Sequence, residues 1–225
     1  MADTARTALL AGATGLVGSH CLSQLLSDPA YGRVVAVVRR PLPLSDPRLD
    51  TRVVDFDRLA AADLPPVDDV YCALGTTIRR AGSREAFRRV DHDYVVALAR
   101  RAAERGATRF LLVSAIGADA RSPVFYSRVK GETERDVAAV SFDAVHLLRP
   151  SLLVGERSEH RSGERLMIAL LTSVTPLLVG PLRRYRPVGA EVVARAMRAL
   201  ARSGDTGVMV YESDRIAQLG ERDAR

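Results

Sequence analysis

Lysine is the residue that this sequence most clearly lacks. Its 33 basic residues include a single lysine, Lys130, and the remaining 32 are arginines. A chain that takes its positive charge from arginine everywhere else keeps an ammonium at this one position. An ammonium is a compact point charge, whereas a guanidinium is a broad fork that stays charged. We therefore interpret Lys130 as a functional side chain rather than as ordinary surface charge.

Cysteine, long apolar runs and metal-binding patterns are scarce as well. The two cysteines, Cys21 and Cys72, fall on expected buried elements, which excludes a disulfide scaffold and indicates reduced thiols in the cytoplasm. No apolar run reaches the ~20 residues of a membrane span, and no basic leader precedes the first apolar stretch. The histidines are scattered without the spacing of metal ligands, so we expect no metal. We also expect a cytoplasmic protein.

The basic charge has no accompanying nucleic-acid motif. The net charge is +6, but the arginines are dispersed and interleaved with acids. The sequence contains no cysteine and histidine spacing of a zinc finger, no recognition-helix signature and no aromatic RNA-binding motif. This pattern favours a solvated surface over nucleic-acid binding. For the cluster Arg183-Arg184-Tyr185-Arg186, a solvated loop and a contact with an anionic substrate or partner both stay open.

A glycine-rich turn near the start has the context of a dinucleotide site. An apolar run at 7–11 predicts a strand, and an amphipathic helical pattern follows the turn. Such glycines allow a tight turn and a close approach of the backbone to a pyrophosphate, which the helix N–H groups then hold. A glycine turn without a ligand is the alternative. The turn reads Gly12-Ala13-Thr14-Gly15-Leu16-Val17-Gly18, with the spacing G-x-x-G-x-x-G.

Two arginines follow the next expected strand, at 33–38. An NAD site usually has an acidic residue there to bind the ribose 2′-hydroxyl, but this chain has Arg39 and Arg40. Guanidinium groups suit a phosphate with several oxygens. The sequence therefore predicts NADP(H) in preference to NAD(H), with a solvated arginine pair as the alternative.

The alternation of strands and helices predicts an α/β fold. Further strands are expected at 51–54, 67–73, 109–114 and 144–149, with helices between most of them. Such alternation predicts one Rossmann-type domain, a doubly wound parallel sheet. We expect residues 1–150 to form the cofactor-binding core and 151–225 a small substrate-binding portion. Ligands bind beyond the carboxyl ends of the strands, where the sequence places Asp55, Phe56, Leu74, Gly75, Thr76 and Ser114.

Tyr126 precedes Lys130 by four residues on a helix expected to begin near Tyr126. Residues four apart lie on one face of a helix, so the phenol and the ammonium point to the same place. A cation beside a phenol favours the phenolate and makes the group a usable acid or base. An amphipathic helix with a chance Tyr and Lys is the alternative.

These motifs together resemble the short-chain dehydrogenase/reductase superfamily, in its extended or atypical branch. The likeness rests on the glycine turn, Tyr126-x-x-x-Lys130, Ser114 twelve residues before the tyrosine, and Arg149-Pro150-Ser151. A narrower likeness is to the Tat-interacting-protein-like group of NAD(P)-binding oxidoreductases. It rests on Cys72–Thr77, Ala81–Ser83, Val90–Val95, Val129–Glu132 and the segment with Arg149.

The resemblance implies a role for each matched residue. Tyr126 would protonate a carbonyl oxygen as hydride arrives, and Lys130 would assist it and bind the nicotinamide ribose. Ser114 would hold the carbonyl, and Arg149 falls in a segment assigned to the cofactor site. Asp91 departs from the superfamily, which commonly has an asparagine there that anchors a proton relay. An ionised carboxylate cannot donate a hydrogen bond, so an inward-facing acid and a partly exposed acid both stay open.

The function expected from the sequence is a cytoplasmic NADPH-dependent reductase of a small carbonyl compound. The alternative is an NADP(H)-binding redox sensor with little or no turnover; a nucleic-acid binder rests on charge alone. The small-molecule substrate is not named by the sequence. The apolar stretch 166–180 is compatible with a pocket-covering helix or with a homodimer contact. Residues 187–193 lead into a helix that is expected to run through Ala201.

Overall fold

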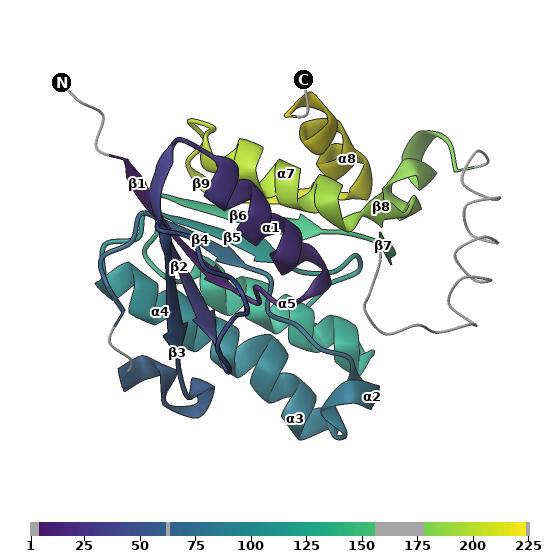
Figure 1. Ribbon diagram of the computed structural model, residues 1–225. Helices are drawn as coiled ribbons and strands as arrows, with labels where there is room; N and C mark the ends of the chain where they lie inside the picture. The colour runs from purple at the N-terminus through teal and green to yellow at the C-terminus, as the bar shows by residue number, and fades with distance from the viewer. Residues whose placement is uncertain (1–4, 62–63, 156–177, 224–225) are drawn as a thin grey trace.

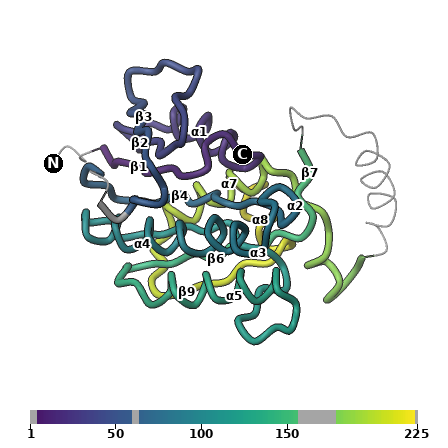
Figure 2. Tube along the Cα trace, turned by 90° about the horizontal axis from the view of Figure 1, so that it is seen from below, coloured from purple at the N-terminus to yellow at the C-terminus, as the bar shows by residue number. Residues whose placement is uncertain are grey.

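A seven-stranded parallel sheet forms the centre of the computed structural model, which describes residues 5–61, 64–155 and 178–223. The strands are β1 (Arg6–Ala11), β2 (Tyr31–Val38), β3 (Leu49–Val53), β4 (Asp69–Cys72), β5 (Arg109–Val113), β6 (Ala144–Arg149) and β9 (Gly207–Glu212). Their order in the sheet is β3-β2-β1-β4-β5-β6-β9, and Figure 2 shows the sheet running from β3 at one edge to β9 at the other. Each neighbouring pair is parallel. The predicted Rossmann-type sheet is confirmed, with an additional edge strand, β9, that the sequence reasoning missed.

Helices cover both faces of this sheet. On one face lie α1 (Leu16–Ser27), α7 (Ala190–Ala201) and α8 (Ser213–Arg222) (Figure 1). On the other lie α3 (Arg84–Arg88), α4 (Tyr94–Glu104) and α5 (Phe125–Ala138), and a π-helical segment, Arg89–Asp93, joins α3 to α4. Because parallel strands need crossover connections, helices on two faces follow from the alternation of the elements. The short elements are the 3₁₀ helices η1 (Phe56–Ala61) and η4 (Gly180–Tyr185), the helix α2 (Ile78–Ala81), and the paired strands β7 (Leu153–Val154) and β8 (Val188–Gly189).

The core is divided between the two faces of the sheet. Successive side chains of a strand point to opposite faces, and in β1 both sets are apolar. Ala8 and Leu10 pack with α1 and α7, whereas Leu9 and Ala11 pack with α4. All four are fully buried. This two-sided burial explains why the strand reads as a continuous apolar run rather than an alternating one.

A polar network closes the amino ends of the strands, opposite the expected site. Tyr31 donates a hydrogen bond to the fully buried Asp69 carboxylate at 2.7 Å, and its hydroxyl lies 2.9 Å from that of Tyr71. The same carboxylate forms ion pairs with Arg6 and Arg109. Buried carboxylates need such partners because desolvation of the charge is costly. The sequence reasoning did not find this network, whose members come from four separate strands.

The C-terminal part contributes to the central sheet as well as to its surroundings. Helix α7 ends at Ala201, as predicted, and β9 pairs with β6. Of the apolar stretch 166–180, residues 166–177 lie outside the described residues. The division at residue 150, with a substrate-binding role for residues 151–225, stays a prediction.

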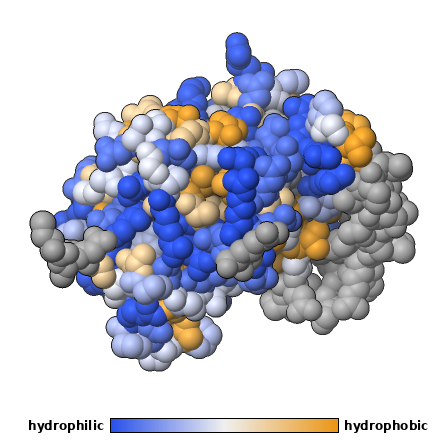
Figure 3. All heavy atoms as spheres, turned by 90° about the horizontal axis from the view of Figure 1, so that it is seen from above, coloured by the Kyte–Doolittle hydropathy of each residue, from blue (hydrophilic) through white to orange (hydrophobic). Residues whose placement is uncertain are grey.

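The surface is mixed, and the two thiols are internal. The face in Figure 3 is mainly hydrophilic, with its hydrophobic side chains in small separate groups. Cys21 and Cys72 are free and buried, as expected, and burial raises the pKa of each thiol to about 12. Within the described ranges, no helix has the length and apolarity of a membrane span. In the same ranges, no three His, Cys, Asp or Glu side chains come together as metal ligands.

Candidate functional site at the carboxyl edge of the sheet

The glycine turn connects β1 to α1 in a conformation that side chains would prevent. Gly12 has a φ of +88°, and a Cβ atom there would overlap the carbonyl oxygen of Ala73, the residue after β4. A Cβ atom on Gly18 would overlap the carbonyl oxygen of Gly12, so this glycine lets α1 pack tightly on the turn. The N–H of Gly15 donates to Gly12 O at 2.8 Å. No side chain caps the start of α1, and its N–H groups therefore suit an anion.

The residues beyond β2 and β3 lie along the same edge of the sheet. Arg39 and Arg40 follow β2 directly; both are exposed, and neither forms an ion pair or hydrogen bond with another described residue. Asp55 is exposed and accepts a hydrogen bond from the N–H of Asp57 at 3.0 Å. Phe56 is buried, with its ring 5.4 Å from that of Tyr94. Its side chain thus belongs to the core under α4 rather than to an open surface.

The loop after β4 approaches the only lysine of the chain. Leu74 packs partly into the core, whereas Gly75 is exposed. A Cβ atom on Gly75 would lie 3.4 Å from Asp91 Oδ1 and 3.7 Å from Lys130 Nζ. The N–H of Thr76 donates to Asp91 Oδ2 at 2.8 Å. The loop residues predicted to contact a cofactor therefore lie directly beside the predicted lysine.

Lys130 forms a buried ion pair with Asp91. The distance from Lys130 Nζ to Asp91 Oδ1 is 2.7 Å, and the two residues are 7 % and 1 % exposed. Burial lowers the pKa of Lys130, but the Asp91 carboxylate and Tyr126 together raise it by more than burial lowers it. The pKa therefore lies above the ordinary 10.5. Lys130 is thus an ammonium at neutral pH. Of the two interpretations of Asp91 left open by the sequence, the structure supports the inward-facing acid.

Tyr126 faces Lys130, and Ser114 follows β5, the strand that precedes α5 in the chain. Tyr126 is in the first turn of α5, half-buried, with its ring 5.5 Å from that of Phe87. Ser114 follows β5, and its N–H donates to Leu148 O at 2.7 Å. The Ser114 hydroxyl is buried and has no hydrogen-bond partner among the described residues. Because buried hydroxyls are nearly always bonded, this oxygen is the kind of group that a ligand would satisfy.

Two residues of α5 that the sequence reasoning did not select support the site. A Cβ atom on Gly131 would overlap the backbone of Asp119 and Ala120, so the absence of a side chain lets the loop after Ser114 lie against the helix. Thr133 Oγ1 lies 2.9 Å from Asp91 O and 2.8 Å from Val129 O and donates its proton to these carbonyls. A glycine inside a helix costs about 1 kcal/mol relative to alanine. A glycine that is kept inside an expected helix in spite of this cost is the sequence feature that could have identified Gly131.

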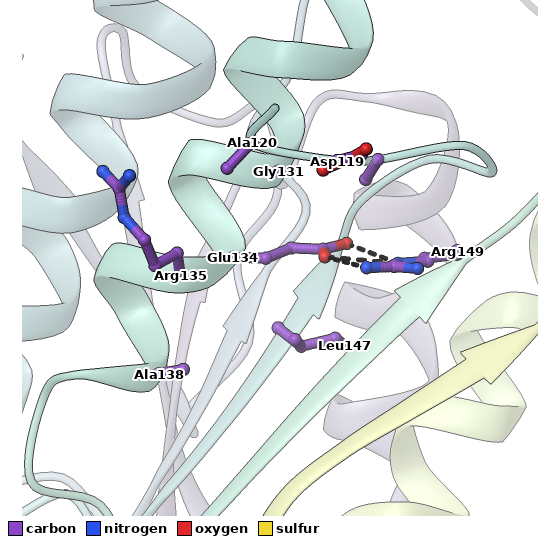
Figure 4. A pocket seen from close by; sticks show the side chains of 9 residues that line it. Asp119, Ala120, Gly131, Glu134, Arg135, Ala138, Leu147 and Arg149 are labelled. Carbon is purple, nitrogen blue, oxygen red and sulfur yellow. Dashed lines mark hydrogen bonds and ion pairs between the residues drawn. The ribbon is translucent and has the colours of Figure 1, made fainter. Parts of the chain in front are cut away.

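Arg149 forms a separate ion pair below α5. Its guanidinium donates to both carboxylate oxygens of Glu134, with Nε 3.0 Å from Oε1 (Figure 4). Glu134 is 4 % exposed, so the pair fixes the end of β6 to the helix. Arg135, in contrast, points away from this pair (Figure 4). The structure thus gives the Arg149 side chain a structural partner and does not place it beside Lys130.

Two shallow hollows border Arg149. The first, about 300 Å³, lies between α5 and β6, over the ion pair with Glu134 (Figure 4). The second, about 290 Å³, lies beyond the carboxyl ends of β5, β6 and β9. It is lined by Ile116, Gly117, Arg149, Arg184, Tyr185 and Glu212. The cluster at 183–186 therefore contributes two side chains to a hollow next to the loop that follows Ser114.

Comparison with known proteins identifies a family for this chain. A family model described as NAD(P)H-binding matches residues 12–154. The protein FMP52, mitochondrial, of Eremothecium gossypii is 37% identical over 216 residues, which cover 94% of this chain and 96% of the relative. The protein HTATIP2 of Rattus norvegicus is 36% identical over 221 residues, which cover 96% of this chain and 90% of the relative. The relatives named mitochondrial contradict the expected cytoplasmic location, which was wrong.

Solved structures share the fold at low sequence identity. MoeE5 in complex with UDP-glucose and NAD matches with a TM-score of 0.67 and 19% identity, over 96% of this chain and 81% of that one. The human epimerase family protein SDR39U1 with NADPH matches with a TM-score of 0.63 and 17% identity, over 97% and 80%. At such identities the likeness establishes the architecture and nothing finer.

Proposed function

This chain belongs to the NAD(P)H-binding family of atypical short-chain dehydrogenases/reductases, and on that basis we propose that it is an NADPH-dependent reductase of small carbonyl compounds. The observation that carries the proposal is the buried ammonium of Lys130 on the same helix face as Tyr126. The unpartnered hydroxyl of Ser114 at the end of the neighbouring strand supports it.

Each of the three side chains has a distinct task in the proposed reaction. Tyr126 donates its hydroxyl proton to the carbonyl oxygen of the substrate. Lys130 keeps a positive charge beside that phenol and binds the ribose of the cofactor. Ser114 donates a hydrogen bond to the same carbonyl oxygen, and such preorganised donors are a major source of rate enhancement. When bound, the reduced nicotinamide supplies the hydride.

The cofactor would lie along the edge that the glycine turn opens. The uncapped start of α1 would hold its pyrophosphate, and the exposed Arg39 and Arg40 would bind a 2′-phosphate. Asp55 and the loop with Leu74 and Gly75 would flank the parts of the cofactor other than its phosphates. The absence of an acidic residue after β2 supports NADP(H) over NAD(H). The hollow between Gly117 and η4 would take the substrate, as part of the C-terminal portion.

Turnover with a matched pair of variants tests the reductase. NADPH oxidation is followed at 340 nm with a panel of aldehydes, ketones and quinones, for the native protein, Tyr126→Phe and Tyr31→Phe. Removal of a general acid costs about 10²–10⁴-fold, so Tyr126→Phe should lose turnover by that factor. Tyr31 lies in the polar network at the amino ends of the strands, opposite the proposed site, and its variant should keep native rates. Equal rates in the two variants would refute the role of Tyr126.

The alternative function, an NADP(H) sensor, is separated by the same experiment. Micromolar NADPH binding without oxidation by any acceptor would support a protein that binds cofactor and does not turn over. Asp91 supports this alternative, because its carboxylate is paired with Lys130 and, when ionised, cannot donate a hydrogen bond as an asparagine side chain can.

Cofactor choice is tested by binding alone. The double variant Arg39→Ala/Arg40→Ala should bind NADPH at least tenfold more weakly and leave the affinity for NADH unchanged, because only NADPH carries the 2′-phosphate. A native protein that binds both cofactors equally would remove the role assigned to these arginines.

A further inference from the structure

Asp91 occupies an irregular place in the helix that faces α5. It lies in the π-helical segment Arg89–Asp93, between α3 and α4. Single π turns inside α-helices are uncommon and occur frequently at functional sites. The backbone carbonyl of Asp91 accepts from Thr133 Oγ1 on α5 at 2.9 Å. The local irregularity is therefore fixed by the same helix that carries Lys130.

The two carboxylate oxygens of Asp91 contact two different parts of the site. Oδ1 is 2.7 Å from Lys130 Nζ, and Oδ2 accepts from the N–H of Thr76 at 2.8 Å. One side chain thus joins the ammonium on α5 to the loop that follows β4. Gly75 covers this junction without a side chain, so the loop leaves space directly beside the two charges.

The negative charge of Asp91 offsets the cost of burying the Lys130 ammonium. Lys130 is 7 % exposed, and burial disfavours a charged amine. The titratable groups that face it are Asp91 from the π-helical segment, Tyr126 from its own helix and Cys72 at the end of β4. Cys72 carries no charge at neutral pH, since burial raises the pKa of its thiol to about 12. An asparagine in place of Asp91 would keep the shape and the acceptor for Thr76 but would leave the ammonium without a counter-charge.

We propose that Asp91 is the positioning residue of this site. Its carboxylate holds Lys130 as a fixed ammonium against the loop of Gly75 and Thr76, so that the lysine and the loop bind the cofactor as one unit. This role deepens the proposed function, on which it rests for the identity of the cofactor. An asparagine could not take this role, because an amide carries no charge to oppose the desolvation of Lys130.

The single lysine allows a direct test on the full-length chain. With ¹³C-labelled lysine, Lys130 gives the only Cε signal, and its chemical shift reports whether Nζ is protonated. In the native protein we expect no titration below pH 10.5. In Asp91→Asn, where burial is no longer opposed, the midpoint should fall by at least about one pH unit. In Glu132→Gln, which removes the ion pair of α5 with Arg88 on α3 but leaves Asp91 in place, it should not move.

NADPH affinity provides the second readout. We expect Asp91→Asn to bind NADPH about tenfold more weakly and Glu132→Gln to bind it as the native protein does. If Asp91→Asn fails to fold, Asp91→Asn/Lys130→Met, which removes both charges, is compared with Lys130→Met. Because Asp91 acts through Lys130, the two should bind NADPH equally weakly. A further tenfold loss in the double variant would overturn the proposal, as would an unchanged Lys130 titration in Asp91→Asn.

These experiments distinguish a failure of the Asp91 proposal from a failure of the proposed reductase function. A shifted lysine titration and weakened NADPH binding in a protein that reduces no carbonyl would disprove the reductase and leave Asp91 in its role. Turnover by the native protein, together with an unchanged lysine titration in Asp91→Asn, would support the reductase and disprove the role of Asp91.

Discussion

His146 should make the stability of this protein depend on pH in a defined window. The side chain lies in β6, is fully buried and has Nδ1 3.1 Å from the hydroxyl of Tyr211. Nε2 has no partner among the described residues. Burial lowers the pKa of His146 from 6.5 to about 4 in spite of the opposing effect of Asp205. The folded protein therefore keeps this histidine neutral under conditions in which the unfolded chain protonates it.

The size of the effect follows from the shift in pKa. A shift from 6.5 to about 4 corresponds to about 3 kcal/mol, at 1.36 kcal/mol per unit. Between pH 6.5 and 4 the unfolded chain binds a proton that the folded protein does not, so stability falls as the pH falls. For a chain of this length, about 3 kcal/mol is a change in Tm of roughly 6–12 °C.

The assay compares the pH dependence of two proteins. Urea unfolding of the native protein and of His146→Leu is measured from pH 7.5 to 4, and carboxylate titration contributes equally to both. The native protein should lose about 3 kcal/mol more than the variant over this range. His20→Gln, a change at a partly exposed histidine of α1, should keep the native dependence. Parallel pH profiles for the native protein and His146→Leu would refute the reasoning.

Three further substitutions test the packing around the site. Lys130→Met leaves the buried Asp91 carboxylate unpaired and should lower the free energy of unfolding in urea by about 3–5 kcal/mol. The double variant Asp91→Asn/Lys130→Met should recover most of this loss. Equal free energies of unfolding for the single and the double variant would contradict a buried ion pair. Gly131→Ala should lower stability by about 1–3 kcal/mol, since the new methyl group meets the backbone of Ala120, although alanine is the better helix former. Gly75→Ala has room for its methyl group and should unfold like the native protein, but should bind NADPH more weakly; unchanged binding would place the cofactor elsewhere.

The parts of the fold that were predicted correctly depend on local patterns. The apolar runs of β1 and β2, the glycine turn and the phase of α5 are all set by residues close together in the sequence. The six strands expected from the sequence are all present, with ends that differ by at most two residues. Strand β9 was missed because it is an edge strand whose Val208 and Val210 are exposed, so it does not read as a buried run.

The parts of the site that were missed depend on contacts between distant residues. Asp91 could be placed near the inward edge of a helix, but its pairing with Lys130 joins residues 39 positions apart through the packing of two helices. Arg149 was expected at the cofactor, yet its guanidinium is held by Glu134, one turn beyond Lys130 on α5. Phe56 was expected at the ligand-binding edge of the sheet, and its ring packs on Tyr94. In each case the partner is chosen by tertiary packing, which a local pattern does not encode.

By itself, the sequence determined the architecture and the chemical character of the site. Glycine spacing, strand periodicity and a Tyr and Lys four residues apart are local constraints, and each acts through the backbone conformation of one segment. Only the tertiary structure decided which charges face one another. The protonation state of Lys130 depends on burial and on a carboxylate from another helical segment. Neither exists until the fold packs the segment Arg89–Asp93 against α5 on one face of the sheet.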